Sequence, residues 1–300
     1  HPEIIPSSYR AEGRGRGLGA PQAPREVAVR IMHETPPFAL ATNPSSAHGM
    51  SESTQDTVSF GYEQVAPEEK TRRVGEVFTS VAKKYDIMND AMSFGMHRGW
   101  KDRFVKRVKP QPGERILDMA GGTGDIAFRM ADRGADVTVA DINQEMLDVG
   151  AARAMDRRET DETGSLVFTQ QNAESVDFAS NSFDAYTIVF GIRNVTFKDK
   201  ALAEAHRVLR PGGRFYCMEF STSEWSGFQQ VYDVYSDALL PRMGQVIAGD
   251  ADSYRYLVES IRKFPKMPEF ERMIGAAGFV NTKYETILGG AVAIHSGWKI

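Results

Sequence analysis

The sequence predicts an α/β protein with a single, mostly parallel sheet of seven strands. Between residues 115 and 220, short apolar runs typical of strands buried on both faces alternate with runs at helical spacing. Two further strand patterns, residues 279–287 and 291–299, are separated only by Gly289-Gly290 and a few neighbours. So short a link joins two strands only as an antiparallel hairpin, and the sheet is therefore expected to end in one.

The first strand leads into a glycine turn and a helix. Ile116 and Leu117 form the apolar run, which ends at Asp118. The glycines after this acid let the backbone turn sharply and let a ligand approach where a Cβ would collide. Apolar residues at helical spacing then extend to Gly134. A strand, turn and helix of this kind at the carboxyl edge of a parallel sheet form a nucleotide-binding corner.

The residues of the turn favour S-adenosylmethionine over a phosphate ligand or a dinucleotide. No Gly-Lys-Ser/Thr follows the glycines, as a phosphate loop requires, and Ala127 takes the place of the third glycine of the dinucleotide pattern. The match is to acid-x-Gly-x-Gly-x-Gly, with Asp118, Gly122 and Gly124 in register and Ala120 in place of the first glycine. This form is typical of S-adenosylmethionine-dependent methyltransferases. Judged alone, the glycines are also compatible with a generic tight turn.

The ends of the next two strands supply further candidate contacts to a cofactor. The strand 137–140 ends at Asp141, whose carboxylate can accept hydrogen bonds from both ribose hydroxyls. This acid favours adenosine-type binding over the generic turn. The strand 166–169 is followed by residues 171–174, where an amide and backbone groups are placed to read the adenine edge. A plain polar strand end is the alternative for that segment.

Composition excludes several other classes of protein. The net charge is −4 and no Lys/Arg-rich block offsets it, which argues against nucleic acid as a partner. No apolar run approaches the length of a membrane span. The single cysteine, Cys217, excludes an internal disulfide framework and fits a reducing compartment. No Cys/His cluster has the spacing of metal ligands, so no metal site is predicted.

Residues 1–58 are expected to form a disordered extension, and residues 59–300 the methyltransferase domain. The extension contains Gly-Arg-Gly-Arg-Gly, scattered prolines and polar patches without a sustained period, so it cannot bury enough apolar area to offset its ordering entropy. Its arginines suggest an organelle transit peptide, but its glutamates are unusual for one. The preferred explanation is that the natural protein starts at Met50, and that residues 1–49 are an over-extended reading frame or a cloning artefact.

Helical patterns precede and follow the alternating units. A helix from Glu68 to about Tyr85 and a second, short helix with Trp100, Phe104 and Val108 on one side predict an N-terminal helical cap. Methionines and aromatic residues between them either pack this cap onto the sheet or line an apolar tunnel beside the cofactor. A helical insertion is expected at about residues 222–265, as a packing element, a lid, a dimer face or a membrane-touching surface.

Several segments together resemble the ubiquinone/menaquinone biosynthesis C-methyltransferase family, from about Ser59 to Ile300. They are residues 81–90, 118–125, 190–196, 248–250, 253–261 and 293–297. The resemblance implies the Rossmann-like class I methyltransferase fold and S-adenosyl-L-methionine as cofactor. It also implies methylation of a ring carbon of a polyprenylated methoxy-benzoquinol (2-polyprenyl-6-methoxy-1,4-benzoquinol), with demethylmenaquinol as a second substrate of some members.

The same resemblance assigns cofactor contacts to individual residues. Thr123, Asp141, Asn172 and Ala173 occupy the cofactor-contact positions of the family. Val189 stands where some members carry a serine, which leaves only a backbone contact at that position. Residues 1–49 have no counterpart in the family.

Arg193, in the loop after the fourth strand, is expected to face the methyl group. A benzoquinol ring carbon becomes nucleophilic when a ring hydroxyl loses its proton, so the enzyme must accept or stabilise that loss. Because arginine is too basic to deprotonate a phenol at neutral pH, we expect Arg193 to stabilise the phenolate or to order a relaying water. Asn194 and Tyr85 are expected to orient the ring. A salt bridge that fixes the loop is the alternative for Arg193, and His97 is a second candidate base, unless it is a surface or capping residue.

Two other functions stay open at this stage. One is a non-catalytic adenosylmethionine-binding scaffold of a quinone-biosynthesis complex, which the intact Asp118, Gly122, Gly124 and Asp141 argue against. The other is methylation of another apolar small molecule. A lipid-tailed substrate predicts peripheral membrane contact, and a homodimer or a quinone-biosynthesis complex is the expected assembly. The expected location is the bacterial cytoplasm at the inner membrane, or else the mitochondrial matrix.

Overall fold

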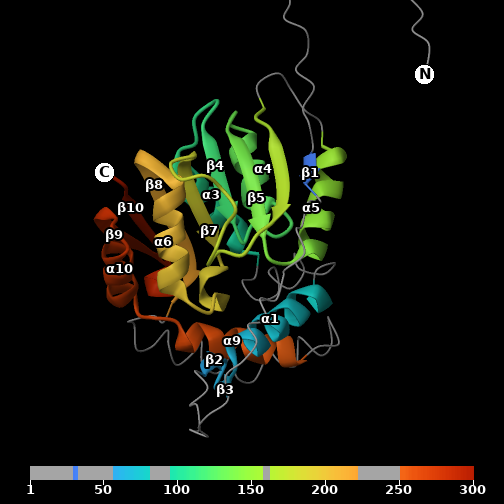
Figure 1. Cartoon of the computed structure of the whole chain (residues 1–300), viewed down its shortest axis with the longest axis vertical. Helices are drawn as coiled ribbons and strands as arrows, with labels where there is room; N and C mark the ends of the chain where they lie inside the picture. Colours follow the sequence, from blue (N-terminus) through green and yellow to red (C-terminus); the bar gives the residue numbers. More distant parts are fainter. Residues whose placement is uncertain (1–29, 33–56, 82–94, 158–162, 222–250) are drawn as a thin grey trace, which may run out of the picture.

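The computed structural model describes residues 30–32, 57–81, 95–157, 163–221 and 251–300. Its centre is one eight-stranded sheet with the strand order β1-β6-β5-β4-β7-β8-β10-β9 (Figure 1). The strands in chain order are β1 Arg30–Met32, β4 Arg115–Met119, β5 Asp136–Asp141, β6 Leu166–Gln170, β7 Phe183–Val189, β8 Leu209–Phe220, β9 Val280–Ile287 and β10 Val292–Trp298.

The pairing of the strands confirms the predicted fold class. The five strands β4 to β8 pair in parallel, whereas β10 runs antiparallel to both β8 and β9. The short helix η4, Leu288–Gly290, forms the link of the terminal hairpin. The strand β8 begins at Leu209, which pairs with Phe183 of β7.

The first strand of the sheet lies in the segment that was expected to be disordered. The three residues of β1 pair in parallel with residues 167–169 of β6, which would otherwise be the edge strand. An edge strand presents unpaired N–H and C=O groups that a short apolar segment such as Ile31-Met32 can use. The prediction of disorder for residues 1–58 is therefore wrong for β1, and the sheet has eight strands where seven were expected. Residues 1–29 and 33–56 lie outside the described residues.

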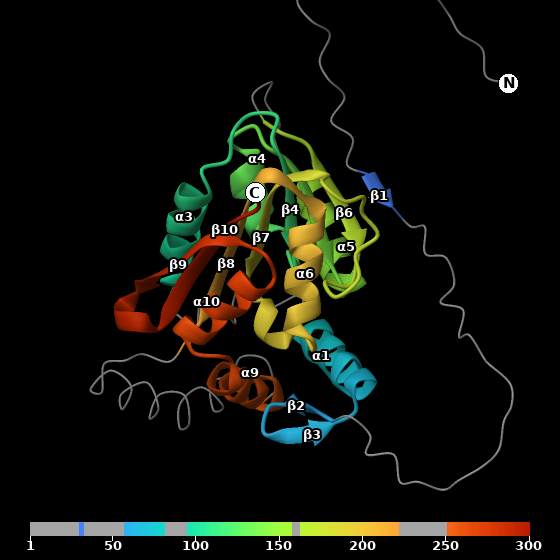
Figure 2. The ribbon, with the colours of Figure 1, turned by 60° about the vertical axis from the view of Figure 1, so that its left-hand side comes forward.

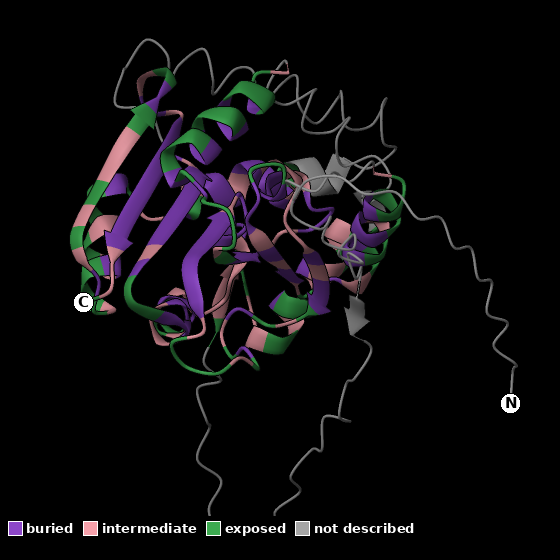
Figure 3. Ribbon diagram, turned by 90° about the horizontal axis from the view of Figure 1, so that it is seen from above, coloured by how far each residue is buried: buried purple, intermediate pink, exposed green. Residues whose placement is uncertain are grey.

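Helices cover both faces of the sheet (Figures 1 and 2). One face carries α3 His97–Val108, α4 Asp125–Ala131 and α5 Gln144–Met155, and the other carries α6 Lys198–Val208 and α10 Met267–Ala276. Each face has its own apolar core, and Figure 3 shows the strands between them as largely buried. The helices therefore shield the middle of the described sheet on both of its faces.

A helical cap lies across the carboxyl ends of the parallel strands. It consists of α1 Pro67–Val81, α9 Ala251–Lys263 and the hairpin β2 Val58–Phe60 with β3 Glu63–Val65 (Figures 1 and 2). Phe60 stacks on Tyr256 of α9 with 4.3 Å between the ring centroids, which joins the hairpin to that helix. Of the predicted insertion, α9 is described, whereas residues 222–250 lie outside the described ranges, as do residues 82–94 between α1 and α3. No helix in the described part of the chain combines the length and the apolar character needed to cross a bilayer.

Candidate cofactor site

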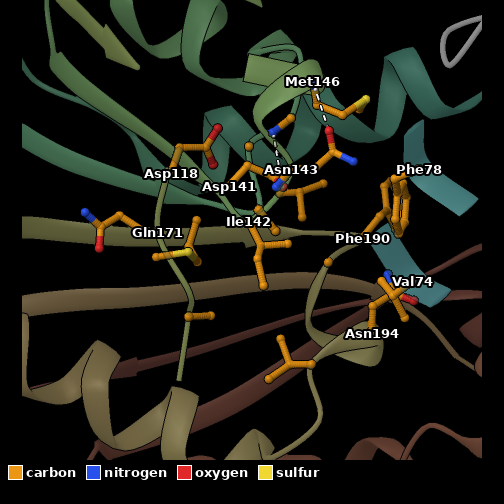
Figure 4. Close-up of a pocket in the computed structure, with 18 of the residues that line it drawn as sticks. Val74, Phe78, Asp118, Asp141, Ile142, Asn143, Met146, Gln171, Phe190 and Asn194 are labelled. Atoms are coloured by element: carbon orange, nitrogen blue, oxygen red, sulfur yellow. Dashed lines mark hydrogen bonds between the residues drawn. The ribbon is translucent and has the colours of Figure 1, made fainter. Parts of the chain in front are cut away.

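A pocket lies where the carboxyl ends of β4, β5, β6 and β7 meet α1 (Figure 4). In Figure 4, Val74 and Phe78 of α1 lie on the opposite side of the pocket from Asp118 and Gln171. The predicted cofactor residues that line it are Asp118, Gly122, Thr123, Asp141, Asn172, Ala173 and Val189. The strand ends therefore converge on one cavity, as the sequence pattern indicates.

The turn after β4 has no room for side chains at two of its glycines. A Cβ on Gly121 would lie 2.7 Å from Val139 Cγ1 and 3.0 Å from Asp118 Oδ2. Gly122 has φ +53°, a backbone conformation that favours glycine, and a Cβ there would lie 3.0 Å from Met146 Cε. The absence of these Cβ atoms leaves the backbone of the turn open to the pocket and able to contact a bound cofactor directly.

Gly124 is the one predicted cofactor residue of the turn that does not line the pocket. It precedes α4 with φ +82°, and a Cβ there would point at the rings of Phe128 and Phe168, 3.4 Å from each. Gly124 therefore serves the geometry of the turn, and the acid-glycine motif mixes residues that face the ligand with residues that shape the backbone.

Ala120 occupies the position of the first motif glycine in a left-handed conformation, with φ +52°. Its Cβ faces Gly191, because a Cβ added to Gly191 would lie 2.4 Å from it. We expect Gly191→Ala to lower the free energy of unfolding by about 1–3 kcal/mol through overpacking. Adding Ala120→Gly should restore most of that stability, since it removes the opposing Cβ. Urea denaturation of the parent and the two variants measures this, and a Gly191→Ala protein as stable as the parent would contradict the contact.

Asp118 has a buried carboxylate with one unused oxygen. It is 1% exposed, and its Oδ1 accepts a hydrogen bond of 2.7 Å from the Thr187 hydroxyl. Among the described residues, no group donates to Oδ2. Burial raises the pKa of Asp118 to about 7, although the Thr187 hydrogen bond opposes this. Because a buried acceptor without a donor is costly, Oδ2 fits the ammonium group of the amino-acid part of S-adenosylmethionine.

Asp141, at the end of β5, is held by the backbone on both sides. Its Oδ2 accepts from the amide N–H of Gly122 and its Oδ1 from that of Asn143, each at 2.9 Å. Burial raises the pKa of Asp141 to about 6, and these N–H donors oppose the increase. Each carboxylate oxygen retains a lone pair, so the fixed side chain can accept the two ribose hydroxyls.

Asp141→Ala should weaken binding of S-adenosylhomocysteine, the demethylated form of the cofactor, by roughly 100-fold or more, because it removes two hydrogen bonds to a charged group. Isothermal titration calorimetry measures the change. Asp148→Ala is a matched control, since that carboxylate lies on the exposed side of α5 and hydrogen-bonds only to Gln144 among the described residues. Equal affinities of the two variants would remove Asp141 from the site.

The other predicted cofactor residues complete the rim. The Thr123 hydroxyl accepts a hydrogen bond of 3.1 Å from Arg153 Nη1. Asn172 Oδ1 accepts from the N–H of Glu174, which folds the segment after β6 around the buried Ala173. These contacts hold Thr123 and the segment after β6 in place at the pocket.

Arg193 forms the salt bridge that was given as its alternative. It lies in the short helix η2, Ile192–Asn194, and its side chain does not line the pocket. Its Nη1 donates to Glu219 Oε1 at 2.8 Å and to the Phe190 carbonyl at 2.6 Å. The two charged side chains are 4% and 1% exposed. Burial raises the pKa of Glu219 and Arg193 opposes the rise, so the two residues form a buried ion pair directly behind the pocket wall.

The other predicted catalytic residues differ in how far the structure describes them. Asn194 lines the pocket, and its Oδ1 accepts from the Tyr256 hydroxyl at 3.1 Å. Burial raises the pKa of Tyr256 to about 12, so this hydroxyl stays a neutral donor. Tyr85 lies outside the described residues. His97 was expected to be a surface or capping residue. It is the first residue of α3 and is buried, so a surface position is wrong, and it does not line the pocket.

Asn143 and Lys101 also line the pocket, although the sequence patterns did not predict them there. Asn143 caps α5 by accepting from the Met146 N–H, and its Nδ2 donates to Gly75 O and Thr79 Oγ1 of α1 at 3.2 and 2.9 Å. It thereby connects the cap to the cofactor corner. In the sequence, an Asn directly before a helical pattern indicates a helix-capping residue, and this could have pointed to Asn143. Lys101, on α3, is 4% exposed and donates to Asp125 Oδ2 at 2.7 Å. In the sequence, Lys101 is a charged residue on the mostly apolar face of α3, and this could have pointed to it.

Comparisons with known proteins support a methyltransferase of one family. The family model described as "ubiE/COQ5 methyltransferase family" matches residues 65–299. A Zymomonas mobilis protein named "Ubiquinone/menaquinone biosynthesis C-methyltransferase UbiE" is 58% identical over 82% of this chain and all of its own length. A Brucella canis protein of the same name is 55% identical over 81% of this chain and 91% of its own.

Solved structures of more distant proteins show the same fold. A Thermotoga maritima SAM-dependent methyltransferase, described as a possible histamine N-methyltransferase, has a TM-score of 0.52 at 18% identity, covering 75% of this chain and 99% of its own. Haemonchus contortus phosphoethanolamine N-methyltransferase 2, in complex with S-adenosyl-L-methionine, has a TM-score of 0.50 at 16% identity, covering 67% of this chain and 52% of its own. The chain therefore belongs to the ubiE/COQ5 methyltransferase family, which confirms the predicted enzyme class and S-adenosylmethionine as its cofactor.

Proposed function

We propose that the protein methylates a ring carbon of a polyprenylated methoxy-benzoquinol in ubiquinone biosynthesis, with demethylmenaquinol as a second acceptor. The observation that carries this proposal is the 58% identity to a named ubiquinone/menaquinone biosynthesis C-methyltransferase over that protein's whole length. Its name, which joins the two quinones, favours the second acceptor. The pocket adds independent support, because apolar side chains such as Val74, Phe78 and Phe190 line it beside the cofactor corner.

The bound cofactor supplies an activated methyl group, so the protein's task is to position a ring carbon in line with it and to make that carbon nucleophilic. The carbon becomes nucleophilic when a neighbouring ring hydroxyl loses its proton. As the new carbon–carbon bond forms, the sulfur–methyl bond breaks, and the ring then releases its own proton to restore the aromatic quinol. The protein must therefore stabilise a phenolate near η2.

Residues around η2 fit this role. The Arg193 guanidinium is paired on one side with Glu219 and has a buried Nε without a hydrogen-bond acceptor among the described residues. We propose that Arg193 stabilises the phenolate or orders a water that relays its proton, and that Glu219 holds the guanidinium in place. We propose that Asn194 contacts a ring oxygen. It lines the pocket from the same short helix, and its Oδ1 accepts from the Tyr256 hydroxyl, which supports this role.

Transfer of labelled methyl to a short-chain demethylated benzoquinol tests the function. Purified protein, labelled S-adenosylmethionine and the reduced acceptor should give a ring-methylated product that mass spectrometry identifies. A parallel reaction with a demethylated naphthoquinol tests the second acceptor, and the Asp141→Ala protein is the negative control. A protein that binds the cofactor but methylates neither quinol would contradict the proposal and favour a scaffold or another apolar acceptor.

We further propose that the protein contacts the inner membrane peripherally in the bacterial cytoplasm. A polyprenyl tail keeps the acceptor in the bilayer. The cap of α1, α9 and the β2–β3 hairpin lies at one end of the sheet (Figure 2), and residues of α1 line the pocket. Bacterial relatives in Zymomonas and Brucella support the location. Co-flotation with vesicles of bacterial lipids should recover the protein with the vesicles, and complete recovery in the unbound fraction would contradict the contact.

A further inference from the structure

Lys101 is a buried cation at the wall of the cofactor pocket. It lies on the buried face of α3, together with Trp100 and Phe104, and is 4% exposed. Its Nζ donates to Asp125 Oδ2 at 2.7 Å. An ammonium has three N–H donors, and this hydrogen bond uses one of them. Lys101 therefore brings unused donors and a positive charge to the pocket.

The pocket is otherwise acidic. In the described part of the chain, Lys101 is the only Lys or Arg side chain that lines it, against Asp118, Asp125, Asp141 and Glu174. S-adenosylmethionine carries an α-ammonium and an α-carboxylate on its amino-acid part. The acids suit the ammonium, but a carboxylate placed among them without a cation would be strongly disfavoured.

Lys101 is not the only cation that pairs with Asp125. Its Oδ1 also accepts from Arg129 Nε at 3.1 Å, so it has a second cation. Although burial raises the pKa of Asp125, Lys101 and Arg129 outweigh that effect and hold it below the usual value. The group is therefore a carboxylate with two cationic partners, and the Lys101 ammonium is available to a second anion.

We infer that Lys101 binds the α-carboxylate of S-adenosylmethionine, with Asp125 holding its Nζ at the pocket wall. Asp118, which lines the same pocket and has the unused Oδ2, takes the α-ammonium, so the two residues recognise the zwitterion as a pair. This inference concerns the cofactor alone and does not depend on which acceptor is methylated.

The test compares two ligands that differ only in the carboxylate. Isothermal titration calorimetry with S-adenosylmethionine and with decarboxylated S-adenosylmethionine, without any acceptor, gives the affinity of each for the parent and for Lys101→Met. We expect Lys101→Met to weaken S-adenosylmethionine roughly 10- to 100-fold, as for loss of a charged hydrogen bond. It should change the affinity for the decarboxylated ligand by less than about threefold, within the scatter of such effects. Lys101→Arg, which keeps the charge, should recover part of the loss.

A purely structural Lys101 gives a different result. If Lys101→Met weakens both ligands equally, or neither, the inference is overturned. Asp125 remains paired with Arg129 in this variant, so we expect it to fold. The double variant Lys101→Met/Asp125→Asn removes both charges, and it should show the same loss of discrimination between the two ligands if the single variant is unstable.

Discussion

Removal of the Arg193 guanidinium is expected to lower kcat by roughly 10²- to 10³-fold while leaving the affinity for S-adenosylhomocysteine nearly unchanged, as for loss of one donor to a developing oxyanion. The side chain lies behind the pocket wall and is not among the lining residues, so it acts on the phenolate through an ordered water and has no contact with the cofactor corner. A single substitution has a second effect, because it leaves Glu219 buried without its counterion. Such a loss destabilises a protein by about 3–5 kcal/mol.

The double variant Arg193→Met/Glu219→Gln separates the two effects. It removes both buried charges, so the protein should fold while phenolate stabilisation is lost. A matched control is Arg214→Met/Glu114→Gln, because Arg214 Nη2 and Glu114 Oε2 form a similar part-buried pair at 2.6 Å and neither residue lines the pocket. The control should keep kcat within about threefold of the parent, as expected for a site away from the chemistry. Full turnover in the Arg193 double variant would mean that the ion pair stabilises the position of η2 and has no role in the reaction.

The strands and the core of the cofactor corner follow from local sequence. Buried parallel strands are short apolar runs with clear ends, and their carboxyl ends must meet at one edge of the sheet. Asp118 and Asp141 could therefore be placed in one site before any contact was known. The pairing of β10 with β8 follows less directly, but the hairpin itself is fixed by its short link.

Contacts between distant segments could not be predicted in this way. Asn143 donates to α1, 64 and 68 residues earlier in the chain, and Lys101 reaches the pocket only because α3 packs beside α4. The partner of Arg193 is 26 residues away on β8, where the sequence shows only an acid at the end of an apolar strand. Each of these side chains is polar but stands at a buried position. A polar residue where the pattern predicts an apolar one is therefore the sign of such a contact in the sequence.

The pH dependence of stability should reveal the raised pKa of Asp118. Burial raises it to about 7, from the usual 3.8. Between about pH 4 and pH 7, the unfolded chain has therefore lost a proton that the folded protein keeps, so the free energy of unfolding falls as the pH rises. A shift of about three pKa units corresponds to at most about 4 kcal/mol. Below pH 4 both states are protonated, and above pH 7 both are ionised, so the slope is confined to this range.

Asp118→Asn should reduce this slope, because the amide keeps the shape of the side chain but cannot ionise. Asp141, whose pKa burial raises to about 6, keeps its own part of the slope. Relative to the parent, the variant should gain stability between pH 5 and pH 7.5 in urea denaturation without cofactor. Asp148→Asn, on the exposed side of α5, should follow the parent at every pH. A stability difference between Asp118→Asn and the parent that does not change with pH would mean that Asp118 already titrates as an ordinary carboxyl group in the free protein.

Cofactor binding should reverse the preference for the protonated acid. An α-ammonium at Oδ2 favours the carboxylate, so S-adenosylhomocysteine should bind more tightly as the pH rises from 5 to 7, by up to about tenfold per pH unit. Calorimetry in buffers of different ionisation enthalpy should detect release of a proton near pH 6. 5′-Methylthioadenosine keeps the ribose but lacks the amino-acid part, so its binding reports the proton release at Asp141 without that at Asp118. Equal proton release with both ligands would place the ammonium elsewhere, and a larger release with S-adenosylhomocysteine would place it at Asp118.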